Sequence, residues 1–144
     1  MIKKISLIVI GFLSIINLSS CDKESPGFNY EFSNTLPPYV ALKSKAAVSA
    51  TKGSTVTFTI QSRTSLQQNT IVKYSVSGVV TLANQSATLL KDKTSVDVSF
   101  TVPANAASGT ATVSIISAAK ADGTPLTIGS NNVAAEQKFT VNVN

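Results

Sequence analysis

Thr55-Val56-Thr57-Phe58-Thr59-Ile60-Gln61 alternates strictly between apolar and polar side chains. Successive side chains of a β-strand point to opposite faces, so this stretch predicts a strand whose apolar residues face a core. The same alternation recurs in Thr70–Ser77, Ser95–Val102, Thr110–Ala118 and Gln137–Val143. The side chains predicted to face the core are Val56, Phe58, Ile60, Val72, Tyr74, Val76, Val96, Val98, Phe100, Val102, Ala111, Val113, Ile115, Phe139, Val141 and Val143.

Shorter apolar pieces complete the predicted strand set. They are Tyr39–Leu42, continued after a break by Ala47–Ala50, then Val79–Ala83 and Ala87–Leu90, with Leu126 and Ile128 in a short strand or a loop. No long stretch after Cys21 has a helical period. About seven strands at intervals of roughly ten residues favour an all-β, immunoglobulin-like β-sandwich over residues 39–144.

The chain begins with a signal-peptide pattern over residues 1–20. Lys3 and Lys4 precede an apolar run from Ile5 to Leu18. A helix of about 14 residues spans roughly 21 Å, which is shorter than a hydrocarbon core of ~30 Å. The run therefore favours a cleaved export signal over a transmembrane helix.

The end of this run, Leu18-Ser19-Ser20-Cys21, resembles the lipobox of bacterial lipoproteins, which has an apolar residue, two small residues and then cysteine. The resemblance implies that the Cys21 thiol takes up a diacylglyceryl group after cleavage before Cys21. Two acyl chains would anchor the protein stably, whereas one chain holds only reversibly. The alternative is an ordinary signal peptide with a chance cysteine near the cleavage site.

Residues 21–38 are predicted to form a flexible tether, because Ser25-Pro26-Gly27 and Pro37-Pro38 disfavour regular structure. Its start resembles the export signal of Bacteroidota-type surface lipoproteins, in which lysine and acidic residues follow the lipidated cysteine. Lys23 and Glu24 match this signal in part, because only one acidic residue follows the lysine. The resemblance implies an outer-membrane lipoprotein displayed at the cell surface. The alternatives are a solvated polar linker and the periplasmic face of the membrane.

Aromatic residues near the tether are the candidate binding residues. Phe28, Tyr30 and Phe32 alternate with polar residues, so a strand would place their rings on one face. Such a segment could add to a partner's sheet edge or contact a sugar, and Tyr39 is a fourth candidate. The alternatives are an extra edge strand packed on the chain's own domain and a partly ordered linker.

The domain also resembles Calx-β and related immunoglobulin-like sandwich modules. The resemblance rests on three stretches: Gly53-Ser54-Thr55-Val56-Thr57-Phe58-Thr59-Ile60, Val72-Lys73-Tyr74-Ser75-Val76-Ser77-Gly78 and Ser95-Val96-Asp97-Val98-Ser99-Phe100-Thr101-Val102-Pro103. Calx-β domains often bind calcium through clustered acids, but Lys52 stands where an acid commonly precedes the glycine. Asp92, Asp97 and Asp122 are scattered, whereas calcium takes six to eight oxygen ligands. No metal or cofactor is expected.

Composition disfavours catalysis and nucleic-acid binding. The chain has no histidine and a single cysteine, so a Ser-His-Asp triad, a free thiol nucleophile and common zinc ligand sets are all unsupported. Loss of Lys3 and Lys4 would leave 10 of the 12 basic side chains against 7 acidic ones, without a basic block. The expected function is a non-catalytic, membrane-anchored binding or accessory module for a protein or glycan. The alternative is a structural spacer or subunit of an outer-membrane assembly.

Overall fold

The computed structural model describes residues 37–144. Within this range the chain forms nine β-strands and two short 3-10 turns. In chain order they are β1 (Tyr39–Leu42), β2 (Val48–Ala50), β3 (Thr55–Ser62), β4 (Thr70–Gly78), β5 (Leu82–Leu89), β6 (Ser95–Thr101), β7 (Gly109–Lys120), β8 (Pro125–Ile128), η3 (Ser130–Asn132), η4 (Ala134–Glu136) and β9 (Lys138–Val143).

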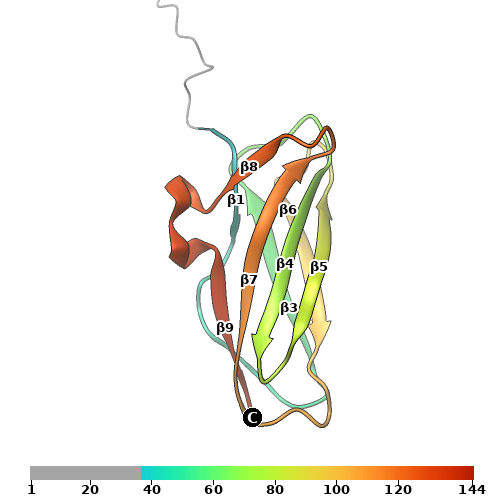
Figure 1. Ribbon diagram of the computed structural model, residues 1–144, viewed down its shortest axis with the longest axis vertical. Helices are drawn as coiled ribbons and strands as arrows, with labels where there is room; N and C mark the ends of the chain where they lie inside the picture. The colour runs from blue at the N-terminus through green and yellow to red at the C-terminus, as the bar shows by residue number, and fades with distance from the viewer. Residues whose placement is uncertain (1–36) are drawn as a thin grey trace, which may run out of the picture. The chain divides into compact units, whose positions relative to one another are not determined.

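The strands form two packed layers (Figure 1). One layer has the order β1-β3-β6, and the other has the order β2-β9-β7-β4-β5. Neighbours within each layer are antiparallel except β2 and β9, which run parallel. In the immunoglobulin arrangement, strands A, B and E lie in one layer and strands C, F and G in the other. Here β1, β3 and β6 take the places of A, B and E, and β4, β7 and β9 take those of C, F and G. The chain is therefore an all-β, immunoglobulin-like sandwich.

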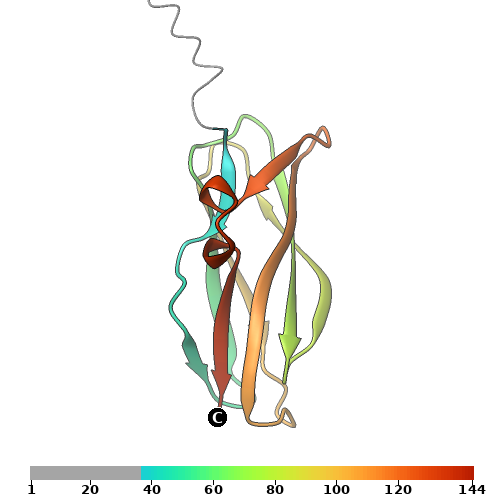
Figure 2. The same cartoon turned by 60° about the vertical axis from the view of Figure 1, so that its left-hand side comes forward.

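The first strand of the sandwich is divided between the two layers. β1 pairs with β3 from Val40↔Ser62 to Leu42↔Ile60, and β2 pairs with β9 from Val48↔Val141 to Ala50↔Val143. The intervening residues 43–47, here called the strap, cross from one layer to the other along one side of the molecule (Figure 2). Higher on that side, β8 joins the layers by pairing with β1 and β7.

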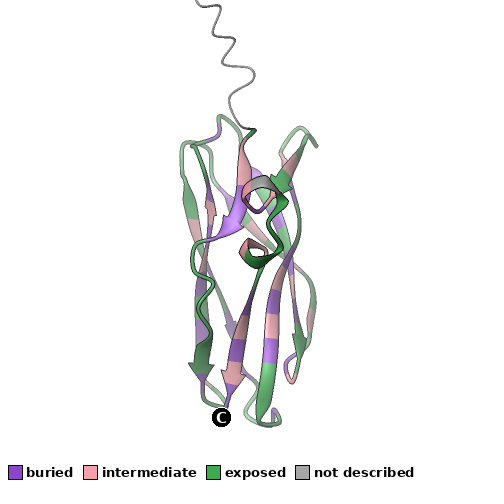
Figure 3. Ribbon diagram, turned by 90° about the vertical axis from the view of Figure 1, so that its left-hand side faces the viewer, coloured by how far each residue is buried: buried purple, intermediate pink, exposed green. Residues whose placement is uncertain are grey.

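Alternation places the apolar side chains between the layers, as the sequence predicts. In β3, Val56, Phe58 and Ile60 are buried, while the threonines between them are exposed or half-buried. Buried and more exposed positions follow one another along the strands (Figure 3). The inward residues predicted for β4, β7 and β9 are also buried. In β6 the prediction holds for Val98 and Phe100, and for Val102 beyond its end, but Val96 is only half-buried. Each large buried side chain contributes ~1.5–3 kcal/mol.

The structure corrects two expectations about the strands. The end of the predicted piece Val79–Ala83 and most of the piece Ala87–Leu90 belong to one strand, β5, which a bulge interrupts, while residues 79–81 precede that strand. The register shifts between Tyr74↔Gln85 and Val76↔Leu82, and Asn84 has a positive φ of 53°. An extra residue in one strand reverses the facing of all later residues, so alternation fails across it. The described range holds nine strands rather than about seven, because the first strand is split and β8 is a separate strand.

Candidate functional site

A groove opens on the side of the sandwich where the strap leaves β3. Its volume is about 430 Å³. The residues that line it are Lys43, Ser44, Ala46, Val48, Thr57, Phe58, Thr59 and Phe139. A second hollow of about 330 Å³ involves Lys45 and Ala47 of the strap with Lys138 and Phe139 of β9. The first volume falls within the range of ~300–1,000 Å³ typical of ligand pockets, so this groove is the candidate site.

Two aromatic rings form the apolar floor of the groove. The Phe58 ring lies 5.5 Å from the Phe139 ring, centroid to centroid, and 5.4 Å from the Tyr74 ring in an edge-to-face arrangement. Such pairs contribute about 0.5–1.5 kcal/mol beyond their buried area. Burial also raises the pKa of the Tyr74 hydroxyl. The floor is therefore a rigid part of the core that an apolar group can contact without opening the sandwich.

The wall of the groove is the free edge of β3. The last contact of the departing strand is a hydrogen bond in which the Lys43 N–H donates to the Thr59 carbonyl at 3.0 Å. Along an antiparallel strand, main-chain groups face alternate sides from one residue to the next. Thr57 therefore presents its N–H and C=O on the same side as Thr59, beyond the point where β1 ends.

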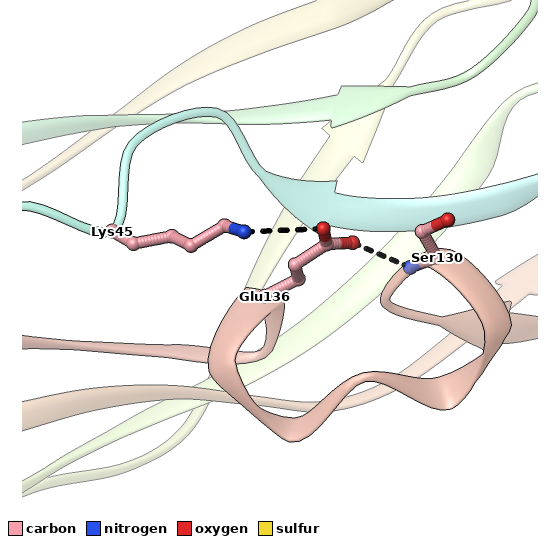
Figure 4. A network of polar contacts seen from close by, with 3 residues as sticks. All are labelled: Lys45, Ser130 and Glu136. Atoms are coloured by element: carbon pink, nitrogen blue, oxygen red, sulfur yellow. Dashed lines mark hydrogen bonds and ion pairs between the residues drawn. The ribbon is translucent and has the colours of Figure 1, made fainter.

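An ion pair holds the strap to the segment between β8 and β9. The Lys45 ammonium lies 3.2 Å from Glu136 Oε1, and the Ser130 N–H donates to Glu136 Oε2 at 2.6 Å (Figure 4). The Ser130 N–H, and then Lys45, lower the pKa of the Glu136 carboxyl. Glu136 is therefore held as a carboxylate that links two segments far apart in the sequence.

Local backbone geometry positions this carboxylate. Gly129 has a φ of 73°, and a Cβ there would lie 2.7 Å from the Val133 carbonyl oxygen. Its N–H donates to the Val40 carbonyl at 2.8 Å, which ties the segment to β1. The Gln137 amide donates to the Ile128 carbonyl at 3.0 Å. These contacts orient the Ser130 N–H toward Glu136.

The rim of the groove and its surroundings carry more positive than negative charge. Lys43 lines the groove, while Lys45 and Lys138 border the second hollow. Within residues 37–144, Lys45 is the only one of these three in an ion pair, and Glu136 is its partner. The rim therefore favours an anionic or hydrogen-bonding ligand group beside an apolar one.

Most of the residues predicted as sites lie outside the described range. They are the lipobox residues Leu18, Ser19 and Ser20, the lipidation residue Cys21, the export-signal residues Lys23 and Glu24, and the aromatic residues Phe28, Tyr30 and Phe32. Tyr39 is described: it is half-buried in β1, opposite Thr127, and does not line the groove. The structure thus does not bring Tyr39 to the candidate site.

Two of the three scattered acids have separate local roles. Asp97 accepts a hydrogen bond from the Thr59 hydroxyl at 2.7 Å. Asp122 accepts hydrogen bonds from the Thr124 N–H at 2.8 Å and from the Gln68 amide at 2.9 Å. Its pKa is lowered first by the Thr124 side chain, then by the Thr124 N–H and by Gln68. Within the described range, no three acidic, cysteine or histidine side chains group as metal ligands would. None of the helical turns in that range has the length and hydropathy of a membrane-crossing segment.

Sequence reasoning assigned Phe58 and Phe139 to the core but missed the groove above them. The alternation of apolar and polar residues shows which face of the strand these rings occupy. It does not show whether another strand covers the edge of β3. The available signal was the break between the two predicted pieces of the first strand, at residues 43–46. A polar break in an edge strand marks a place where pairing can change partner.

Comparisons with known proteins add little to this geometry. No family model matches the chain, and no curated protein matches it. Among solved structures it is similar to the CARDB domain of a Pyrococcus furiosus protein, which was crystallised in complex with di-metal ions. The identity is 14%, the alignment covers 76% of this chain and 90% of that one, and the TM-score is 0.39. At this level of similarity, the argument about the site rests on the chain's own residues.

Proposed function

We propose that this chain is a non-catalytic binding module, anchored to the outer membrane through lipid on Cys21, that holds a protein or glycan partner in the groove beside β3. The observation that carries the binding role is the groove itself: two aromatic rings floor it, main-chain groups of β3 wall it, and Lys43 stands at its rim. The Bacteroidota-type lipoprotein and Calx-β-like resemblances of the sequence belong to this proposal. Lys23 and Glu24 would direct the chain to the cell surface, with the periplasmic face as the alternative.

The absence of catalytic groupings supports the non-catalytic part of the proposal. The chain has no histidine, and its one cysteine is the proposed lipid acceptor. In residues 37–144, the only ion pair joins Lys45 to Glu136, and it links the strap to the segment between β8 and β9. Neither nucleic acid nor a metal cofactor is part of the proposed function.

The anchor is tested by metabolic labelling with a fatty acid and mass spectrometry of the mature N-terminus. The wild-type chain should carry label on Cys21 and partition into detergent, and Cys21→Ser should lose both properties. A mature protein with an unmodified cysteine would support an ordinary signal peptide instead. Protease treatment of intact cells then separates surface display from the periplasmic face, since only a surface protein is cleaved.

The groove is tested by co-purification after mild detergent extraction of membranes. Ala46 is exposed and lines the groove, so Ala46→Trp should fill it and release the partner. Ala104 is exposed in the connection between β6 and β7, so Ala104→Trp is the matched control and should retain the partner. A partner kept by both variants would favour a structural spacer that docks elsewhere. A glycan array probed with the same proteins identifies a sugar ligand.

A further inference from the structure

The unpaired part of β3 provides main-chain hydrogen-bonding groups at Thr57, which lines the groove, and at Thr55, which lies beyond it along the strand. β3 pairs with β6 along its length, from Thr55↔Thr101 to Gln61↔Ser95. On its other side, β1 covers it only down to the bond between Lys43 and Thr59. Thr55 and Thr57 therefore present N–H and C=O groups on a side that no strand of the described range covers.

The spacing of these groups restricts what can satisfy them. Residues two apart on a strand lie about 6.6–6.8 Å apart, and each offers one donor and one acceptor. An extended polypeptide repeats its own donors and acceptors at this spacing, whereas a sugar ring does not. Addition of such a strand to a free edge is an established mode of peptide recognition.

We propose that the groove binds an extended peptide segment of a partner protein, which adds to β3 as a strand where β1 leaves it. The bound segment continues the row that β1 begins, so the existing β1–β3 ladder fixes its plane and its distance from β3. This inference rests on the proposed function, which places the partner in the groove. It adds that the bound part of the partner is an extended peptide.

The lining of the groove sets the preferred peptide sequence. Alternate side chains of an added strand point to opposite faces. Those that point inward meet Phe58 and Phe139, so they are apolar. Those that point outward lie near Lys43, which makes no ion pair with any residue in the range 37–144, so an acidic side chain is favoured. The preferred segment alternates apolar and acidic residues.

The test uses the full chain purified in mild detergent and an array of synthetic peptides of about eight residues, a common strand length. Alternate positions carry valine, isoleucine or phenylalanine, and the others carry threonine or glutamate. The strongest binder is then measured in solution against two proline variants. Thr57→Pro removes an N–H that faces the groove. Ser99→Pro removes one that faces away from β3, at the residue paired with Thr57.

Both proline variants should fold, because proline is tolerated where the lost N–H faces a free edge, and thermal unfolding checks this. Thr57→Pro should weaken peptide binding by about tenfold or more, as expected for the loss of a main-chain hydrogen bond, and Ser99→Pro should leave it unchanged. A peptide N-methylated at the residue opposite Thr57 should bind the wild-type protein as weakly. This measurement stands even if Thr57→Pro misfolds.

Three results would overturn the inference. One is an N-methylated peptide that binds as tightly as its parent, which would exclude main-chain pairing. Another is an array in which no peptide binds the wild-type chain above the level of Thr57→Pro. The last is a glycan that binds and is displaced by Ala46→Trp while peptides do not bind; the groove would then remain the ligand site, and only the peptide class would fail.

Discussion

The unpaired strand edges on the two long sides of the sandwich differ in the features that hinder pairing with another strand. On one side, β5 and β6 each pair with a single neighbour, and β5 carries the bulge at Asn84 while β6 carries Asp97. Bulges and charged residues are devices that prevent edge-to-edge association. On the other side, the part of β3 that β1 does not cover has no bulge. It borders the groove, and only the strap lies beside it. The difference teaches that one side is shaped to repel an added strand and the other is shaped to receive one.

The largest expected loss of stability comes from removing one buried aromatic ring, in one variant for each side of the sandwich. Phe58→Ala and Phe100→Ala should each lower the free energy of unfolding by about 3–5 kcal/mol, because both rings are buried. The Phe58 value should be the smaller, since the neighbouring groove lets the cavity open to solvent. Denaturant unfolding of both variants measures this. Equal losses would mean that the groove does not relieve the cavity at Phe58.

A second comparison addresses the turn that holds the Glu136 carboxylate. Gly129→Ala should cost about 1–3 kcal/mol, because its Cβ would meet the Val133 carbonyl as well as requiring a left-handed φ. Gly123→Ala is the matched control: Gly123 has a φ of 87° and open space around it, so the cost should be about 1 kcal/mol. Thermal unfolding with and without a groove-binding peptide would show whether the turn also supports binding. A smaller loss for Gly129→Ala than for Gly123→Ala would contradict the geometry.

One substitution should stabilise the bulged side. Thr70 begins β4, between Leu89 of β5 and Lys120 of β7, and is fully buried. Its hydroxyl oxygen has no hydrogen-bond partner among the described residues. Thr70→Val should therefore raise the free energy of unfolding by about 1 kcal/mol, by removing an unsatisfied polar atom.

The matched control for this gain is an exposed threonine on the neighbouring strand. Thr88→Val on β5 should change stability by less than about 0.5 kcal/mol, because Thr88 is exposed. Denaturant midpoints of the two variants give the comparison. A loss of stability in Thr70→Val would indicate that the hydroxyl is satisfied in solution.

The smallest effect concerns the strap and depends on pH. Folding lowers the pKa of Glu136 below its ordinary value of 4.5, so its contribution to stability is present above that value. The contribution is lost as pH falls through the lowered pKa. The protection factor of the strap amides, which is the intrinsic exchange rate divided by the observed rate, should therefore fall on acidification below about pH 4.5 in the wild-type chain.

Two variants separate this effect from other acids. Glu136→Gln should show low strap protection factors already at neutral pH, and these factors should depend less on pH than in the wild-type chain. Asp122→Asn removes a second carboxyl with a lowered pKa, held by Thr124 and Gln68 away from the strap, and should leave strap exchange unchanged. Strap exchange that is insensitive to Glu136→Gln would show that the ion pair does not hold the strap.

Much of the fold could be predicted from the sequence, because alternation reports directly which face each side chain occupies. This worked for β3, where Val56, Phe58 and Ile60 are buried. It failed across β5, where Leu82 and Leu89 both pack toward the core although their positions differ by an odd number. The bulge supplies the extra residue, and no local pattern marks it.

The groove could not be predicted, because it arises from a change of pairing partner between segments far apart in the chain. The short apolar pieces Tyr39–Leu42 and Ala47–Ala50 are compatible with one continuous edge strand. The transfer of the second piece to β9 depends on contacts made about 90 residues later in the chain, including the Lys45–Glu136 pair. A pairing choice of this kind is decided by the assembled sandwich rather than by the strand's own residues.

The parallel pairing of β2 with β9 has a mechanical consequence. The described chain begins at one end of the sandwich and finishes at the other (Figure 1). Tension between Pro37 and Asn144 would pull β2 and β9 in opposite directions along their length, so the ladder from Val48↔Val141 to Ala50↔Val143 would be loaded in shear. Its evenly spaced bonds must then yield together rather than unzip one by one. Forced unfolding would be slow for so small a domain, because its rate is set by the barrier to that concerted rupture.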